Sequence, residues 1–478
     1  MILKPESVIL GLIQPEYMSV PEGFISTLAW KAFSTEGVGE TDSAWLRYKQ
    51  RPGKPPHSKV RLTEPSGNSK AILLDALTNG GLSYRSDDKK AAITANAILN
   101  SIYGLQTANS NAVPVSPLTP SLALLQNARG LMSKPSPANY AQIFENVFSI
   151  GDISNKTPKE DTGVVKLWLA ATTRHLESSP ILTLIDNAIQ APGVTPLGAR
   201  TLLDDDQKRT TVTNSLIQSF ETDTPFNWFN KAWKRLTSEP WVDGLPSKVW
   251  IDWASTVMRT SMGLTYLWEA SFYHAVADQI LSDDPAMANI FSLSLETVPW
   301  VPRSEGLELR DVSSKLKRRV ATAQKIKKYL DELQKNSSTE TLDDFLTAMS
   351  GDAKVKDKLR ELQSAKHNNS ASDNYWEAIR FSLMIRSSTA TNTDHYGLLR
   401  KHGNRYSLVD PATEWIACVA SLSSPTPTSQ ISLGEIIRDL RSLGLKPNMR
   451  ELIGHLERAG MARGSDDADL GLMVETAY

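Results

Sequence analysis

The side chains of this 478-residue chain that could catalyse a reaction or bind a metal are scattered along the sequence. Its seven histidines include no pair at the His-x3-His spacing that binds zinc from one helix face. The single cysteine, Cys418, excludes a Cys/His zinc cluster. Three consecutive acids, Asp204 to Asp206, could bind a divalent cation, but no spaced oxygen ligands complete a loop around them, and an acidic loop is the alternative. We therefore expect no metal ion and no cofactor.

Nucleophilic catalysis has little basis in the sequence. Asp394 precedes His395, but adjacent side chains rarely face each other, and no Gly-x-Ser-x-Gly elbow is present. Cys418 lies in the apolar run Trp415-Ile-Ala-Cys-Val-Ala, which is typical of a buried thiol rather than a nucleophile. The chain is expected to be non-enzymatic, and an enzyme with an unrecognised helical active site stays an alternative.

The best candidate for a binding site is a basic segment. Between Lys315 and Lys335 the chain has eight Lys or Arg residues and two acids. Apolar residues from Val312 to Leu333 recur there at spacings of three and four, which predicts a basic amphipathic helix. Cations on one rigid face can follow a phosphate backbone. A solvated face on a helix that packs by its apolar stripe is the equal alternative. The candidate nucleic-acid contacts are Lys315, Lys317, Arg318, Arg319, Lys325, Lys327 and Lys328.

A second aromatic and basic segment allows two interpretations. Six of the twelve tryptophans fall between Trp228 and Trp268, with Lys and Arg residues among them. Aromatic rings beside cations can stack the bases of a single strand. Trp250, Trp253 and their apolar neighbours have helical spacing, however, which is typical of a packed core. A core is therefore favoured over a stacking platform.

The clearest local pattern lies in residues 431–478. Ser432 and Glu435 form a capping box ahead of an apolar helical run, and Gly444 follows as a helix stop. Asn448 can cap a second helix, which Gly460 ends. Alternating apolar residues then predict a strand near the end of the sequence.

This order of helix, turn, helix and strand resembles the winged-helix superfamily, over residues 431–478 only. The resemblance implies that the second helix and the wing after it form the contact surface. That surface is expected to carry Arg450, Glu451, His455, Glu457 and Arg458 on the helix and Asp466, Asp467 and Asp469 on the wing. Because DNA affinity depends on neutralised phosphates, this mixed surface favours a protein-docking or structural role over DNA reading. Arg450 and Arg458 are its candidate nucleic-acid contacts.

Composition and periodicity predict a mainly α fold, that is, a multi-domain helical protein with minor β and a C-terminal winged-helix-like module. Charged residues make up 22% of the chain and the net charge is −1, so no global field attracts nucleic acid or acidic lipid. The expected divisions are an N-terminal mixed or helical domain (1–155), a Trp-rich helical core domain (156–300), a basic amphipathic helix with a helical linker (301–368) and a C-terminal domain (369–478).

The sequence also indicates a compartment. The apolar run Val8 to Ile13 is too short for a signal peptide, and no stretch reaches the roughly 18 apolar residues of a membrane span. Low cysteine content favours a reducing environment. We expect a cytoplasmic protein without a membrane partner.

These observations favour a binding protein over an enzyme. The expected function is that of a non-enzymatic subunit or adaptor of a larger nucleic-acid-associated assembly, with protein partners and with DNA or RNA bound through the basic helix. In broad plan the chain resembles accessory subunits of bacterial DNA-processing or anti-phage defence complexes. A stand-alone winged-helix DNA-binding regulator is the alternative from the same class.

Overall fold

The computed structural model describes residues 10, 12–15, 21–34, 116–125, 140–152, 163–189, 195–196, 216–282, 290–292, 295–337, 342–365, 372–386, 394–403, 405–462 and 472–478. Within these residues the fold is mainly α, as the periodicities predict, with short two-stranded sheets. The acidic triplet Asp204 to Asp206 and the wing aspartates Asp466, Asp467 and Asp469 lie outside the described residues.

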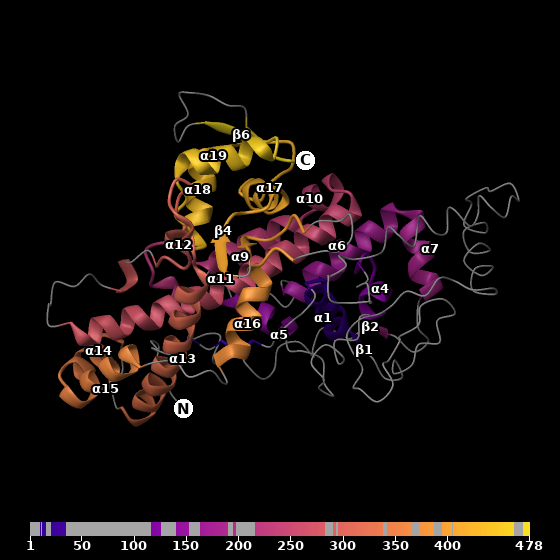
Figure 1. Ribbon diagram of the computed structural model, residues 1–478. Coiled ribbons are helices and arrows are strands. Elements are labelled where there is room, and N and C mark those ends of the chain that lie inside the picture. The colour runs from indigo at the N-terminus through magenta and orange to yellow at the C-terminus, as the bar shows by residue number, and fades with distance from the viewer. Residues whose placement is uncertain are drawn as a thin grey trace, which may run out of the picture.

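The molecule is organised around one long helix, α11 (Ser247–Leu281), which has 35 residues. At a rise of about 1.5 Å per residue it is roughly 52 Å long. Every residue from Trp253 to Tyr273 is buried, so α11 is enclosed on all sides and not on one face only. It packs against α9 (Pro225–Leu236), α13 (Ser313–Asn336) and α16 (Ser372–Leu383), and Figure 1 shows it crossing the centre of the molecule.

The remaining helices surround this centre. On the N-terminal side α1, α4, α5, α6 and α7 pack on one another, and α5 also packs on α9. Their bounds are Glu22–Ala32, Pro120–Leu125, Tyr140–Ile150, Val164–Ser178 and Pro180–Ile189. Shorter elements follow along the chain: α10 (Glu239–Gly244), η3 (Ile290–Ser292), α12 (Leu307–Arg310), α14 (Leu342–Ser350) and α15 (Ala353–Ser364).

A buried carboxylate fixes the start of α6. Glu145 of α5 accepts the backbone N–H groups of Val164 and Val165 at 2.9 and 2.8 Å, which satisfies two donors that a helix start leaves unpaired. A side chain at Gly163 would place its Cβ 2.8 Å from this carboxylate, so the close approach requires glycine. Burial raises the pKa of Glu145, and the hydrogen bonds from the two backbone groups act against that rise.

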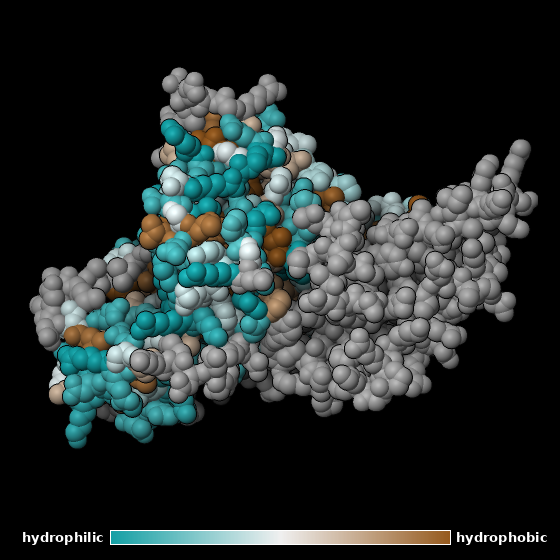
Figure 2. Space-filling model, viewed as in Figure 1, coloured by the Kyte–Doolittle hydropathy of each residue, from teal (hydrophilic) through white to brown (hydrophobic). Residues whose placement is uncertain are grey.

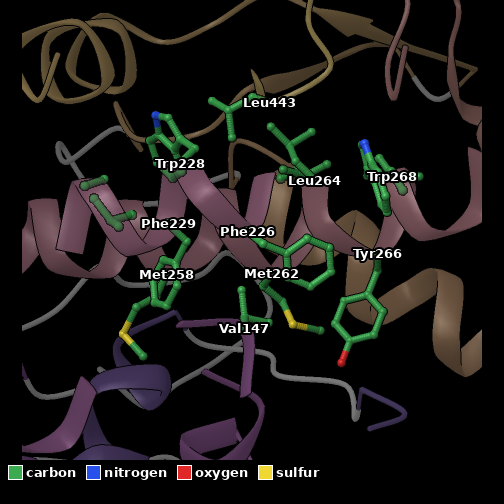
Figure 3. Packing of buried hydrophobic residues seen from close by; sticks show 14 of the residues in the cluster. Val147, Phe226, Trp228, Phe229, Met258, Met262, Leu264, Tyr266, Trp268 and Leu443 are labelled. Atoms are coloured by element: carbon green, nitrogen blue, oxygen red, sulfur yellow. The ribbon is translucent and has the colours of Figure 1, made fainter. Parts of the chain in front are cut away.

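The tryptophan-rich segment is core. All six tryptophans from Trp228 to Trp268 are buried, which confirms the packing interpretation and leaves none of them free to stack on bases. Figure 3 shows Phe226 and Trp228 of α9 together with Met262 and Trp268 of α11. One cluster of buried apolar side chains runs through the described residues from Leu10 to Val474.

The C-terminal part contains α17, β5, α18, α19 and β6, with bounds Thr413–Ser421, Gln430–Ser432, Leu433–Ser442, Met449–Arg458 and Met473–Glu475. The predicted caps are confirmed: Ser432 and Glu435 form the capping box of α18, and the Asn448 side chain accepts N–H groups of the first turn of α19. Gly444 and Gly460 both have a φ of +73°, as helix stops require. Strands β5 and β6 pair antiparallel.

Two other small sheets lie in the described residues. Strand β3 (Leu399–His402) pairs antiparallel with β4 (Tyr406–Val409). Strand β1 (Phe33–Ser34) pairs antiparallel with β2 (Thr195–Pro196), far away in sequence.

The C-terminal elements are attached directly to the helical body. The backbone N–H of Thr297 donates to the carbonyl of Gly444 at 2.9 Å, and Val298 forms a parallel bridge with Leu445. Lys231 of α9 pairs with Asp439 of α18 at 2.6 Å. Leu443 reaches the aromatic core (Figure 3). The winged-helix identity of 431–478 stays a prediction.

Among the described helices, none has both the length and the apolar character that spanning a bilayer would need.

Candidate nucleic-acid interface

Helix α13 is held in place by its apolar stripe and by its first residues. Leu316, Val320, Ile326 and Leu330 are buried, and the helix packs on α11 and α16. Before its first turn, the backbone N–H of Val312 donates to the carbonyl of Ser407 in β4 at 3.0 Å. The predicted amphipathic helix is thereby confirmed: its apolar face packs on α11 and α16, and its opposite face points outward.

Two of its predicted cations point into the protein. Arg319 donates from Nη1 to the carbonyl oxygens of Thr297 and Glu296 at 2.9 and 3.2 Å. Lys327 places Nζ 2.5 Å from Oε1 of Glu269 in α11. Tyr375 donates to the other oxygen of Glu269 at 2.7 Å. Arg319 and Lys327 therefore tie α13 to the body and are already paired inside the protein.

These inward contacts also affect titration. Burial lowers the pKa of the Arg319 guanidinium, although the nearby charge of Glu296 acts in the opposite direction. Burial raises the pKa of Tyr375 well above its usual value, and the adjacent Glu269 carboxylate raises it further. The raised pKa keeps the Tyr375 phenol protonated, so it can donate to Glu269.

Four other cations of α13 point outward. Lys315, Arg318, Lys325 and Lys328 are exposed, and none of them has a hydrogen bond or ion pair with any described residue. Lys317 is half-buried and has an interaction of its own. The sequence contains no Asp or Glu from 312 to 330 that could neutralise this face. The surface where α13 and α15 lie in Figure 1 is mostly hydrophilic in Figure 2.

The two predicted cations of α19 lie elsewhere. Arg450 is exposed, and Arg458 has Nη2 2.9 Å from Nδ1 of His455. Figure 1 places α19 at the top of the molecule and α13 near the bottom. The structure therefore brings together the outward cations of α13 but does not bring Arg450 and Arg458 to them.

The expectation that His455 is exposed on α19 is wrong. Its side chain is 5% exposed and packs edge-on against Trp300, with ring centroids 5.8 Å apart. Burial, followed by the charges of Arg458 and Arg303, lowers the pKa of His455 to about 4. The next turn of this face is also covered, since the backbone N–H of Arg303 donates to Glu451. Residues 300 to 303 thus lie against one side of α19.

Asp394 and His395 do not form a catalytic pair. The Asp394 carboxylate accepts from Nη1 and Nη2 of Arg259 at 3.2 and 3.1 Å and from the backbone N–H of Tyr396 at 3.0 Å. His395 is exposed, whereas Asp394 is buried. Sequence reasoning missed this ion pair because its members are 135 positions apart.

The ion pair extends into a buried network. Arg386 donates its backbone N–H to Asp394 at 2.8 Å and its guanidinium to Glu22 of α1 at 3.2 and 3.3 Å. Arg259 also donates to the carbonyls of Ser382 and Met384 at 3.0 and 2.7 Å. The network joins α1, α11 and the segment after α16, so its role is structural.

A metal-binding cluster is not assembled in the described part of the chain. No three His, Cys, Asp or Glu side chains gather there in a way that could hold a metal ion. Cys418 is fully buried with its Sγ 3.9 Å from the carbonyl of Trp253, and burial raises the pKa of its thiol. Such a thiol is inert, which confirms the core interpretation.

Comparison with known proteins finds no match: no family model, no curated protein and no solved structure matches this chain. Its function is therefore argued from its own residues.

Proposed function

We propose that this chain is a non-enzymatic, nucleic-acid-binding subunit of a larger assembly. In this proposal the outward face of α13 contacts phosphates and residues 431–478 form a winged-helix-type docking module. The phosphate-binding part rests on the separation of inward, paired cations from outward cations on α13. The docking part rests on the exposed apolar side chains of α19 and β6.

The observation that carries the proposal is that α13 keeps four cations on its outer face that have no partner among the described residues. Lys315 and Arg318 are three positions apart, as are Lys325 and Lys328, so each pair brings like charges onto neighbouring turns. Such pairs destabilise a helix by about 0.2–0.5 kcal/mol each. These cations make no stabilising contact with the described residues, whereas binding to a phosphate backbone would neutralise them and release counterions.

The surface of 431–478 supports docking to protein rather than reading of DNA. Residues 431–478 contain six Lys or Arg and eight Asp or Glu. One side of α19 is covered by Trp300 and Arg303, as described above. Three large hydrophobic side chains are exposed on this part: Met449 at 36%, Met473 at 49% and Tyr478 at 36%. Exposed apolar side chains in a charged setting are typical of protein contact sites.

The test of the phosphate contact is a four-charge substitution with a matched control. The variant K315Q/R318Q/K325Q/K328Q removes the outward cations, and K354Q/K401Q/R438Q/K446Q removes three lysines and one arginine that are exposed on other elements. We expect the first variant to lose binding to mixed-sequence DNA and RNA in fluorescence anisotropy. The control should bind like the native chain.

Equal losses in both variants would show that binding follows net charge and not α13. A native chain that binds no nucleic acid at low salt would refute the proposal outright. Circular dichroism melting of all three proteins checks that the substitutions leave the fold intact.

The docking part of the proposal has its own test. The tagged native chain is isolated from its cells after nuclease treatment, beside M449E/M473E and the four-charge variant of α13. We expect protein partners to remain with the native chain and the α13 variant and to be lost from M449E/M473E. Partners that disappear with nuclease alone would contradict direct docking.

A further inference from the structure

We infer that the outward face of α13 is arranged for double-stranded DNA, with Lys315 and Arg318 contacting one backbone and Lys325 and Lys328 contacting the other. This inference rests on the proposed function and specifies which nucleic acid the same face takes. The observation that carries it is that the four outward cations of α13 form two separate pairs.

The spacing of the pairs follows from helix geometry. Within each pair the residues are three positions apart, which is about 5 Å along the axis. The centres of the two pairs are ten positions apart in sequence, or about 15 Å along the axis. Arg318 and Lys325 are seven positions apart, so their directions differ by only about 20°. The midpoints of the two pairs are ten positions apart, so they are rotated by about 80° about the helix axis, and both lie outside the buried apolar stripe.

The surface between the pairs is interrupted. Ala321, Thr322 and Ala323 are all buried, so the turn that separates the pairs presents no charge. The face thus consists of two patches and not of one continuous track. A single strand is followed most favourably by a continuous track, whereas two patches match two separate backbones.

The distance between the patches fits a duplex. The major groove of B-form DNA is about 12 Å wide. Patches about 15 Å apart on a rigid helix can therefore meet the two backbones that flank one groove, with long Lys and Arg side chains closing the remaining gaps. Duplex RNA has a deep and narrow major groove, so the same spacing does not match its backbones.

The described aromatic side chains give a second reason. Proteins that bind single strands without sequence preference stack bases on exposed aromatic rings. Tyr329 is the one aromatic residue of α13, and it is half-buried beyond the second pair. None of the tryptophans whose side chains the structure describes is exposed. Tyr478 is exposed but packs against Trp253 of α11. Helix α13 itself therefore offers cations for phosphates but no exposed ring on which a base could stack.

The test compares salt dependence across nucleic acids and pair variants. A labelled duplex DNA, one of its single strands and the matching duplex RNA are titrated with the full chain by anisotropy at several salt concentrations. The slope of log K against log salt should fall by about 1.8 for K315Q/R318Q and by about 1.8 for K325Q/K328Q on duplex DNA, since each lost phosphate contact contributes about 0.9. The control K401Q/K446Q should keep the native slope.

A second substrate tests the assignment of each pair to its own strand. A duplex in which one strand has neutral methylphosphonate linkages presents only one charged backbone. The native chain should bind it with a slope reduced by about 1.8 relative to the all-phosphate duplex, because two of the four phosphate contacts are lost. An unchanged slope would mean that all four cations follow one strand.

The outcomes separate this inference from the proposed function. Single-stranded DNA or duplex RNA bound as tightly as duplex DNA, with the same dependence on α13, would overturn the duplex inference and leave the phosphate contact intact. A slope that depends on one pair only would also overturn it. If no nucleic acid responds to either pair, the proposed function fails together with the inference.

Discussion

Replacing Asp394 by alanine should destabilise the protein strongly. Asp394 and Arg259 form an ion pair whose side chains are 0% and 3% exposed. Removing one partner leaves the other as an uncompensated charge in the interior, which typically costs about 3–5 kcal/mol. We expect D394A to lower the free energy of unfolding by about that amount.

The contacts explain why the cost is large and how variants should rank. Besides Arg259, the carboxylate accepts the backbone N–H groups of Arg386 and Tyr396 at 2.8 and 3.0 Å. Alanine leaves both donors unpaired, and each unpaired buried donor costs about 1–3 kcal/mol. Asparagine keeps an oxygen acceptor but removes the charge, so D394N should cost less than D394A.

Urea denaturation with a double-mutant cycle measures the interaction. R259M removes the cation and keeps much of the side-chain volume. The double variant R259M/D394A should be little worse than D394A, because it leaves no unpaired member of the pair. Strictly additive losses, or a loss below about 1 kcal/mol for D394A, would refute the reasoning from the buried pair. D331N, which breaks an exposed pair with Lys335, is the control and should have little effect.

The same pair predicts a dependence on pH. Burial on its own would raise the pKa of Asp394, but the charges of Arg259 and Arg386 outweigh it, and the pKa is lowered in the folded protein. The unfolded value is about 3.9. Stability from this group is therefore complete above about pH 5 and is lost as pH falls through the unfolded pKa toward the lower folded pKa. The difference in stability between the native chain and D394N should stay constant above about pH 5 and shrink only in stronger acid, and a difference that grows on acidification would contradict the assignment.

Two further predictions concern backbone and burial. G444A should lower the melting temperature more than G460A: both glycines have φ +73°, for which a Cβ costs about 1–2 kcal/mol, but a Cβ at 444 would also collide with Thr297, whereas position 460 is open. Equal shifts would contradict a tight contact between 297 and 444. Cys418, the only cysteine, should react with a thiol reagent no faster than the protein unfolds, because it is fully buried with a raised pKa. Rapid labelling of the native chain would contradict this.

Local signals in the sequence predicted local structure well. The Ser432–Glu435 box, the Asn448 cap and the glycine stops at 444 and 460 were all readable because each interaction joins residues within a few positions of one another. The aromatic core followed from helical spacing, which reports burial directly.

Long-range contacts had no such signal. Arg319 and Lys327 have the same residue types and spacing as their outward neighbours. Lys327 pairs with Glu269, which is 58 positions away in the sequence and comes close to it only in the folded protein. From the sequence, His455 is expected on the exposed face of its helix. It is buried because Trp300, 155 positions earlier in the sequence, packs against it. For the same reason the sequence offered seven equivalent cations on the basic segment, and only tertiary packing separates the structural ones from the free ones.

The remaining alternative for α13 is a face that only contacts solvent. Other exposed helix faces of the same chain provide a comparison. On the neighbouring α15, Lys358 pairs with Glu361 and Arg360 pairs with Asp357 within the helix. At the end of α13, Lys335 pairs with Asp331 in the same way. Acids three or four positions away thus neutralise cations on these exposed faces. Arg318 and Lys325 have no acid at these spacings, and Asp331, which is three positions from Lys328, pairs with Lys335 instead. A solvated face gains from such acids, whereas a phosphate-binding face would be weakened by them, so the missing acids favour binding.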